Sequence, residues 1–97
     1  MVMDDYYVYI MTNKRNGTIY TGCTSNLPRR VYEHKHDFVD GFTKRYVCHL
    51  LVYYESPGSY DGARTREIAI KNWHRNWKLR LIEQHNSDWK DLYDEIL

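Results

Sequence analysis

The chain has 97 residues, of which 42% are hydrophobic, and a formal net charge of +1. This length predicts one domain, because a second hydrophobic core would need more chain, and the composition argues against disorder. The near-zero charge argues mildly against nucleic-acid binding, and no segment approaches the ~20 apolar residues of a membrane span.

The N-terminus and the cysteines indicate a cytoplasmic protein. Residues 1–5 carry no basic patch followed by an apolar run, so a signal peptide is not expected. Cys23 and Cys48 stand 25 positions apart without a CxxC partner, a pattern that predicts neither a zinc site nor a disulfide framework. Two reduced thiols are typical of the cytosol.

Charge is unevenly distributed along the chain. Residues 14–45 contain seven Lys and Arg but only three acidic residues, while the C-terminal ten residues carry most of the compensating negative charge. A basic face with an acidic tail elsewhere is compatible with phosphate binding.

Two strands and a turn predict a hairpin at the start of the chain. Residues 6–12 and 18–23 are rich in aromatic and branched side chains, and Asn16-Gly17 supplies turn chemistry between them. The register stays open: a loop of four to five residues sets Tyr9 across from Tyr20, and a two-residue turn does not. Strand alternation lets one face carry Tyr9 and Tyr20 beside Gly22, although packed or surface tyrosines are the plainer interpretation.

A helix and a strand follow the hairpin. Ser25 or Asn26 can cap a helix over residues 27–36, with Pro28 in its first turn. The mixed polarity of residues 37–46 predicts a loop. Residues 49–55 read as a third strand, whose continuous apolar centre suits burial on both faces.

The C-terminal part is predicted to be helical. A helix opens at Asp61 and runs to about residue 76, and residues 77–84 either continue it with a bend or form a new helix. Ser87 is expected to cap a last short helix. Its buried stripe would contain Trp89, Leu92, Tyr93 and Ile96. The order strand, strand, helix, strand, helices predicts an α/β (α+β) fold with a small sheet flanked by helices.

The positions of two groups of polar side chains suggest a role in catalysis or ligand binding. Arg30 and His34 lie at i and i+4, so they share a helix face that could bind phosphate and move a proton, or simply face solvent. His34 and His36 form an HxH pair without a third ligand, so zinc is not expected.

Glu67 shares a helical stripe with Ala63, Ile70 and His74, which directs a carboxylate toward the body of the protein. A buried carboxylate needs a partner or a metal ion. The partner could be Arg64, Arg66 or Lys71, and a single hard oxygen ligand with open water positions would suit Mg²⁺.

The combined spacing of Tyr7-Val8-Tyr9, Tyr20-Thr21-Gly22, Arg30 and His34 resembles the GIY-YIG nuclease superfamily. Four segments look like its small stand-alone bacterial members, so the resemblance covers nearly the whole chain. These segments are residues 20–35, 41–44, 51–55 and 86–93.

The resemblance implies a three-stranded antiparallel sheet flanked by helices and one divalent metal ion, Mg²⁺ or Mn²⁺. Tyr9 matches the tyrosine that activates the attacking water, and Tyr20 the second motif tyrosine, which supports water or phosphate. Arg30 matches the arginine that holds phosphate charge, with His34 beside it. Glu67 matches the metal-binding glutamate, and Asn86 is assigned to the late asparagine.

The chain departs from the family pattern at two positions. Tyr7 stands where the family name has Gly, and its bulk would narrow access or stack a base. Thr21 stands where the name has Ile, on the strand face opposite Tyr20, so this change should loosen core packing without removing a catalytic group.

These features predict a metal-dependent endonuclease that acts on DNA, or on RNA, and is directed by structure and not by sequence. We expect four basic side chains to bind the phosphate backbone of the nucleic acid without reading its sequence: Lys35, Lys44, Arg45 and Lys71. A partner protein would direct targeting, since 97 residues leave no room for a targeting domain. The alternatives are a non-catalytic nucleic-acid-binding module of the same fold and a protein-interaction domain that uses its aromatic surface.

Overall fold

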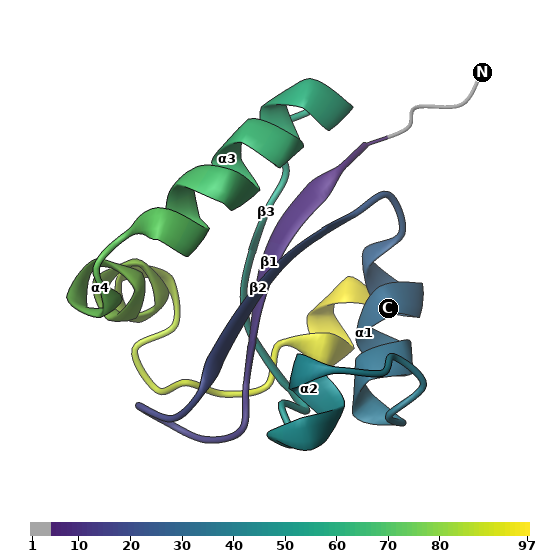
Figure 1. The fold of residues 1–97 in the computed structure, drawn as a ribbon, viewed down its shortest axis with the longest axis vertical. Helices are drawn as coiled ribbons and strands as arrows, with labels where there is room; N and C mark the ends of the chain where they lie inside the picture. Colours follow the sequence, from purple (N-terminus) through teal and green to yellow (C-terminus); the bar gives the residue numbers. More distant parts are fainter. Residues whose placement is uncertain (1–4) are drawn as a thin grey trace.

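The centre of the fold is a three-stranded antiparallel sheet with strand order β2-β1-β3, built from β1 (Tyr7–Thr12), β2 (Ile19–Thr24) and β3 (Leu50–Glu55). A computed structural model describes residues 5–97. The signal-peptide prediction concerns residues 1–5, and residues 1–4 lie outside the described part of the chain. The predicted α+β class is confirmed, with helices on both faces of the sheet (Figure 1). None of the helices within residues 5–97 is long and apolar enough to cross a membrane.

The hairpin register differs from the longer-loop alternative. Tyr9 pairs with Gly22, and Tyr20 pairs with Met11, so the two tyrosines lie diagonally on one face and not directly opposite. The loop covers residues 13–18, where the Asn13 side chain accepts a hydrogen bond of 2.9 Å from the Thr18 backbone N–H. This local hydrogen bond lengthens the connection beyond a tight Asn-Gly turn.

Helices α1 (Leu27–Lys35) and α2 (Phe42–Arg45) cover one face of the sheet, together with the C-terminal 3₁₀ helix η1 (Tyr93–Ile96) (Figure 1). The Asn26 side chain accepts a hydrogen bond from the Arg29 N–H and caps α1, as predicted. The prediction of a loop over residues 37–46 is wrong for α2, a single helical turn that begins after Gly41 with φ 108°.

Helices α3 (Tyr60–Asn72) and α4 (Arg75–His85) cover the opposite face (Figure 1). The Ser59 side chain accepts from the Gly62 N–H and starts α3, one residue before the predicted start. The extended backbone of Trp73 and His74 ends α3, so α4 is a separate helix.

The C-terminal segment is mostly irregular, so the predicted Ser87 cap is wrong. The four residues predicted to be buried are buried or half-buried, but they do not form one helical stripe. Ser87 lies in a turn, and the only helical element after it in the described chain is η1. Trp89 adopts a positive φ of 55° and packs on the α3–α4 face, whereas Leu92 packs on the other face. One helical stripe cannot serve two faces of a sheet.

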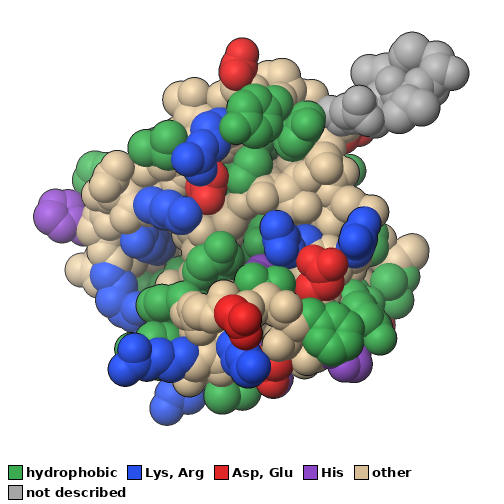
Figure 2. Space-filling view, turned by 45° about the vertical axis from the view of Figure 1, so that its right-hand side comes forward, with side chains coloured by type: hydrophobic (Ala, Val, Ile, Leu, Met, Phe, Trp, Pro, Cys, Tyr) green, Lys and Arg blue, Asp and Glu red, His purple; other side chains and the backbone are tan. Residues whose placement is uncertain are grey.

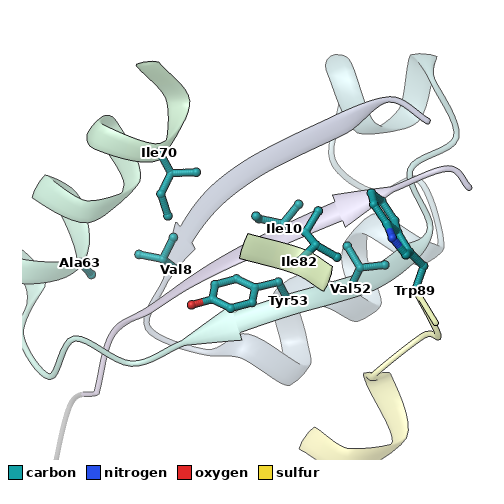
Figure 3. Packing of buried hydrophobic residues seen from close by; sticks show 8 residues of the cluster. All are labelled: Val8, Ile10, Val52, Tyr53, Ala63, Ile70, Ile82 and Trp89. Atoms are coloured by element: carbon teal, nitrogen blue, oxygen red, sulfur yellow. The ribbon is translucent and has the colours of Figure 1, made fainter. Parts of the chain in front are cut away.

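The sheet separates two hydrophobic clusters. The α3–α4 core is apolar apart from one tyrosine hydroxyl and one indole N–H (Figure 3). It consists of Val8, Ile10, Val52, Tyr53, Ala63, Ile70, Ile82 and Trp89. The α1–α2 core consists of Tyr9, Met11, Leu27, Val31, Cys48, Leu51 and Leu92. β3 serves both cores, as its continuous apolar centre predicted, and a bulge opposite Ile10 and Met11 sets Val52 and Tyr53 on the same side.

The two departures from the family pattern are part of this packing. Tyr7 is half-buried against the α1–α2 core, and Thr21 is buried in β2. A threonine fits this position because the buried pleat favours a β-branched side chain.

Candidate active site

A buried chain of hydrogen bonds joins the central strand to both helices on its face. The Tyr9 hydroxyl lies 2.8 Å from His34 Nε2, and His34 Nδ1 lies 2.8 Å from the Thr43 hydroxyl. Tyr9 and His34 are each 1% exposed, and Thr43 is 2% exposed. Thr43 is not among the predicted site residues; the one sequence signal near it is the resemblance of residues 41–44 to the family, which gives this residue no role.

The protonation states of this chain follow from its burial. Burial, helped by the positive charge of Arg30 and opposed by Glu33, lowers the pKa of His34 to about 4, so the imidazole is neutral at pH 7. Burial, with Tyr20 and Glu67 adding to it and Arg30 opposing it, raises the pKa of Tyr9 far above its usual value. Both contacts are satisfied when Nδ1 carries the single imidazole proton and donates to the Thr43 hydroxyl, which leaves Nε2 to accept from the Tyr9 hydroxyl.

Gly22 makes room for the Tyr9 ring. A Cβ atom at Gly22 would lie 2.5 Å from both Cζ and the hydroxyl oxygen of Tyr9, which is too close for any side chain. Tyr20 lies on the same sheet face, with its ring centroid 6.3 Å from that of Tyr9 and 5.4 Å from that of His34. The predicted sharing of one face by Tyr9, Tyr20 and Gly22 is therefore confirmed.

Arg30 stands at the solvent side of this group. Its side chain is 41% exposed, and Nη1 lies 3.4 Å from Glu33 Oε1, a weak contact that leaves the other donors of the guanidinium free to bind a ligand. Arg30 and Glu33 line a shallow pocket of about 310 Å³ between the end of β2 and the first turns of α1. A guanidinium at the rim of a pocket suits a phosphate.

Glu67 approaches from α3, on the other side of β2. Its Oε1 accepts 2.8 Å from Arg64 Nη1 and its Oε2 accepts 2.8 Å from Lys71 Nζ, so two of the three anticipated partners are present. Burial by itself would raise the pKa of Glu67, but the hydrogen bonds from Lys71 and Arg64 outweigh it and lower that pKa. The ammonium of Lys71 also lies 5.9 Å from the Tyr20 ring centroid, which brings this ion-paired group next to the tyrosines.

The carboxylate of Glu67 fits a divalent ion as a single protein ligand. It is ionised and buried, and its two cationic partners are about half exposed and able to turn away. Within residues 5–97 no group of three or more His, Cys, Asp or Glu side chains forms a closed metal cage. An ion bound here would take its other ligands from water and phosphate, as Mg²⁺ commonly does.

The edge position of β2 explains why these residues meet. Tyr9 and Tyr20 come from the sheet, Arg30 and His34 from the helix on one face, and Glu67 from the helix on the other face. At the edge of a sheet, groups from both faces can approach one ligand.

Asn86 does not join this group. It is buried next to β3, at the opposite edge of the sheet, where its side-chain amide donates to the Val52 and Lys90 carbonyl oxygens at 3.1 and 2.8 Å. Its side-chain oxygen accepts from the Lys90 N–H at 3.2 Å. The bond to Val52 holds the segment after α4 against β3, and the two bonds to Lys90 close the turn within that segment, so the position of Asn86 indicates a structural role.

The four residues predicted to bind the nucleic-acid backbone differ in whether their charge is free to contact a phosphate. Lys35 donates to the His49 carbonyl oxygen at 2.8 Å and pairs with the Asp91 carboxylate, so its charge is used inside the protein. Lys44 is exposed and 3.5 Å from Asp40, and Arg45 stacks over the Tyr46 ring at 5.5 Å. Lys71 is the partner of Glu67 described above. The placement of Lys35 argues against a phosphate contact, while the other three stay accessible.

Comparisons with known proteins agree with this arrangement. Residues 5–80 match the family model of the GIY-YIG catalytic domain. The chain is 38% identical over 82 residues to a UPF0213 protein of Staphylococcus haemolyticus, covering 84% of this chain and 99% of that protein. It is 37% identical over 84 residues to a UPF0213 protein of Syntrophus aciditrophicus, covering 86% and 95% of the two chains.

A solved structure has the same fold. The solution NMR structure of a UPF0213 protein from Bacillus halodurans superposes with a TM-score of 0.56 at 25% identity. The superposition covers 90% of this chain and 92% of that one.

Proposed function

The chain belongs to the GIY-YIG nuclease family, and from this premise we propose that it is a divalent-metal-dependent endonuclease acting on DNA in the cytoplasm. The observation that carries the proposal is the buried hydrogen bond between Tyr9 and a neutral His34, beside Arg30 and within electrostatic reach of Glu67. Target choice would rest on nucleic-acid structure, with any sequence preference supplied by a partner protein.

The proposed reaction is in-line hydrolysis of a phosphodiester bond. Tyr9 needs to lose its proton before it can accept one from water, and burial makes this loss difficult. That proton would pass to His34 Nε2, 2.8 Å away, once the negative charge of a bound phosphate has raised the pKa of the imidazole from about 4, and Thr43 would hold the ring in the orientation that this transfer needs. The leaving oxygen would take its proton from solvent. Tyr20 would help to position the water or a phosphate oxygen.

Charge on the phosphate is balanced by groups from both sides of β2. Arg30 would donate to the non-bridging oxygens. Glu67 would hold one Mg²⁺ or Mn²⁺ ion, which supplies electrostatic stabilisation of the developing charge. Arg64 and Lys71, once released from Glu67, would turn toward the phosphates.

One observation favours a second candidate, a nucleic-acid-binding module of the same fold without catalysis. Both oxygens of Glu67 already accept hydrogen bonds from cations, and Tyr9 is almost fully buried. Such a protein would use Arg30, Lys44, Arg45 and Lys71 for binding alone.

Cleavage of labelled single strands, flaps, branches and duplexes, as DNA and as RNA, separates the two candidates. The assay is run with Mg²⁺, with Mn²⁺ and with chelator on wild type, Glu67→Ala, Glu67→Gln and Asp61→Asn, an exposed carboxylate on the same helix. Both Glu67 variants should lose about 100-fold or more in rate while still binding, because Arg64 and Lys71 remain, and Asp61→Asn should cut normally. If wild type and all variants are equally inert but bind the panel, the binding module is correct.

A further inference from the structure

The free edge of β2 connects two hollows on the molecular surface. At its end, the pocket of about 310 Å³ is lined by Arg29 and Arg30. At its beginning, a broader hollow of about 550 Å³ is lined by Lys14, Phe42 and Arg75, together with the turn of the hairpin. The six residues of β2 span about 20 Å, enough for a few nucleotides between the hollows.

Exposed aromatic rings lead from the candidate active site into the second hollow. The Tyr20 and Phe42 ring centroids are 6.0 Å apart, and those of Phe42 and Tyr46 are 4.8 Å apart. Phe42 is 43% exposed and Tyr46 is 41% exposed, so neither ring is a core residue. Aromatic rings exposed in series are costly in water unless a flat, apolar partner covers them.

Positive charge accompanies this row of rings. Lys14 and Arg45 have no carboxylate partner among residues 5–97, and Arg45 stacks on Tyr46. Arg75 donates from Nη2 to the Asn16 and Gly17 carbonyl oxygens at 2.8 and 2.6 Å, so it fixes the hairpin turn while keeping its charge. Figure 2 shows Lys and Arg side chains gathered at the lower left of one face, whereas elsewhere on that face acidic side chains lie next to basic ones.

Aromatic rings and positive charges side by side on the protein suit a ligand that has flat faces and regularly spaced negative charges. In a duplex each base is stacked between its neighbours and offers only its edge, whereas an unpaired strand can turn its bases onto aromatic rings. Resting on the proposed function, we propose that an unpaired nucleic-acid strand lies along the free edge of β2, with a base next to the scissile phosphate stacked on Phe42. Tyr46 receives the following base, and Lys14, Arg45 and Arg75 hold the phosphates. The preferred substrate is therefore a flap, loop or single strand and not continuous duplex.

The test measures binding in chelator, so that it does not depend on cleavage. Fluorescence anisotropy compares a labelled single-stranded oligodeoxynucleotide with its duplex, for wild type, Phe42→Leu and Phe42→Tyr. Leucine keeps the apolar contact with Tyr20 but removes the ring, so single-strand affinity should fall about tenfold while duplex affinity changes less than about twofold. Tyrosine should retain the affinity. The matched control is Phe38→Leu, because Phe38 is 68% exposed but stacks with Tyr32 and His36 instead.

A second readout locates the base. An oligonucleotide that carries 2-aminopurine loses fluorescence when this base stacks, and wild type should quench it more than Phe42→Leu does. Equal single-strand affinity in wild type and Phe42→Leu, or equal losses for single strand and duplex, would overturn the strand path and leave the nuclease proposal intact. A protein that cuts nothing but shows the Phe42-dependent loss would retain the strand path and refute the nuclease.

Discussion

Alternate residues of β1 point to opposite faces of the sheet, and the two faces have different roles. Val8 and Ile10 point into the α3–α4 core, which is filled by branched and aromatic side chains. Tyr9, between them, points into the α1–α2 core, where a Tyr–His–Thr chain of hydrogen bonds runs through the packing. The α3–α4 face, called the structural face below, thus stabilises the fold. The α1–α2 face, called the site face, contains the buried polar groups of the candidate active site.

The largest expected effect is on the site face. Tyr9→Phe removes only the hydroxyl that bonds to His34, so the cleavage rate should fall about 10²–10⁴-fold, the size of a general-base contribution. Stability should fall by about 1–3 kcal/mol, because His34 Nε2 loses its partner. The measurement is the single-turnover rate beside the free energy of unfolding in urea.

Tyr53→Phe is the matched control for this variant. Tyr53 also bonds through its hydroxyl, to Glu55, but it belongs to the α3–α4 core. It should lose some stability and keep its activity. An active Tyr9→Phe would break the division between the two faces.

On the structural face we expect a large loss of stability and no change in the cleavage rate. Ile10→Ala empties a fully buried position and should cost about 2–5 kcal/mol of unfolding free energy. The rate per folded molecule should stay at the wild-type level. Activity that falls in step with Tyr9→Phe, at temperatures where the variant is fully folded, would contradict this prediction.

Acid should act through the site face. The pKa of His34 is about 4 in the folded protein and 6.5 ordinarily, so the unfolded chain binds the extra proton first and stability is lost as pH falls from 6.5 toward 4. The loss from this group should be about 2 kcal/mol at pH 5. Urea unfolding at pH 7 and pH 5 should show it in wild type and not in His34→Gln. An equal loss in both proteins would assign the acid sensitivity to other groups.

A smaller effect is expected from filling the space beside Tyr9. Gly22→Ala places a methyl 2.5 Å from the ring, so it should cost about 1–3 kcal/mol and lower activity by displacing the hydroxyl from His34. Gly62→Ala is the comparison, because its Cβ would lie 3.1 Å from the Ser59 hydroxyl oxygen and 3.4 Å from Pro57, outside the range of a severe overlap. Thermal unfolding and the cleavage rate would be measured on both. A neutral Gly22→Ala would show that the ring can move freely.

Much of the fold could be predicted from local patterns. The three strands, a cap for α1 at Ser25 or Asn26 and the burial of Glu67 follow from alternation, capping chemistry and helical spacing. These signals depend on neighbours a few residues away, so a sequence carries them directly. Helix α2 has no such signal, because one helical turn has too few residues to show a period.

The site itself was predicted as a set of residues but not as a geometry. Motif spacing pointed to Tyr9, Tyr20, Arg30, His34 and Glu67. It did not show that Tyr9 bonds to His34, that Thr43 orients the imidazole, or that Asn86 and Lys35 are held in structural contacts.

The sequence by itself determined the three strands and helix α1, the sharing of one strand face by Tyr9, Tyr20 and Gly22, and the family. Only the tertiary structure decided that β2 is an edge strand, which lets α1 and α3 bring their side chains to one ligand from opposite faces of the sheet. The reason is physical: strand order and the packing of distant helices arise from contacts between segments far apart in the chain, and no local pattern encodes their distance or orientation.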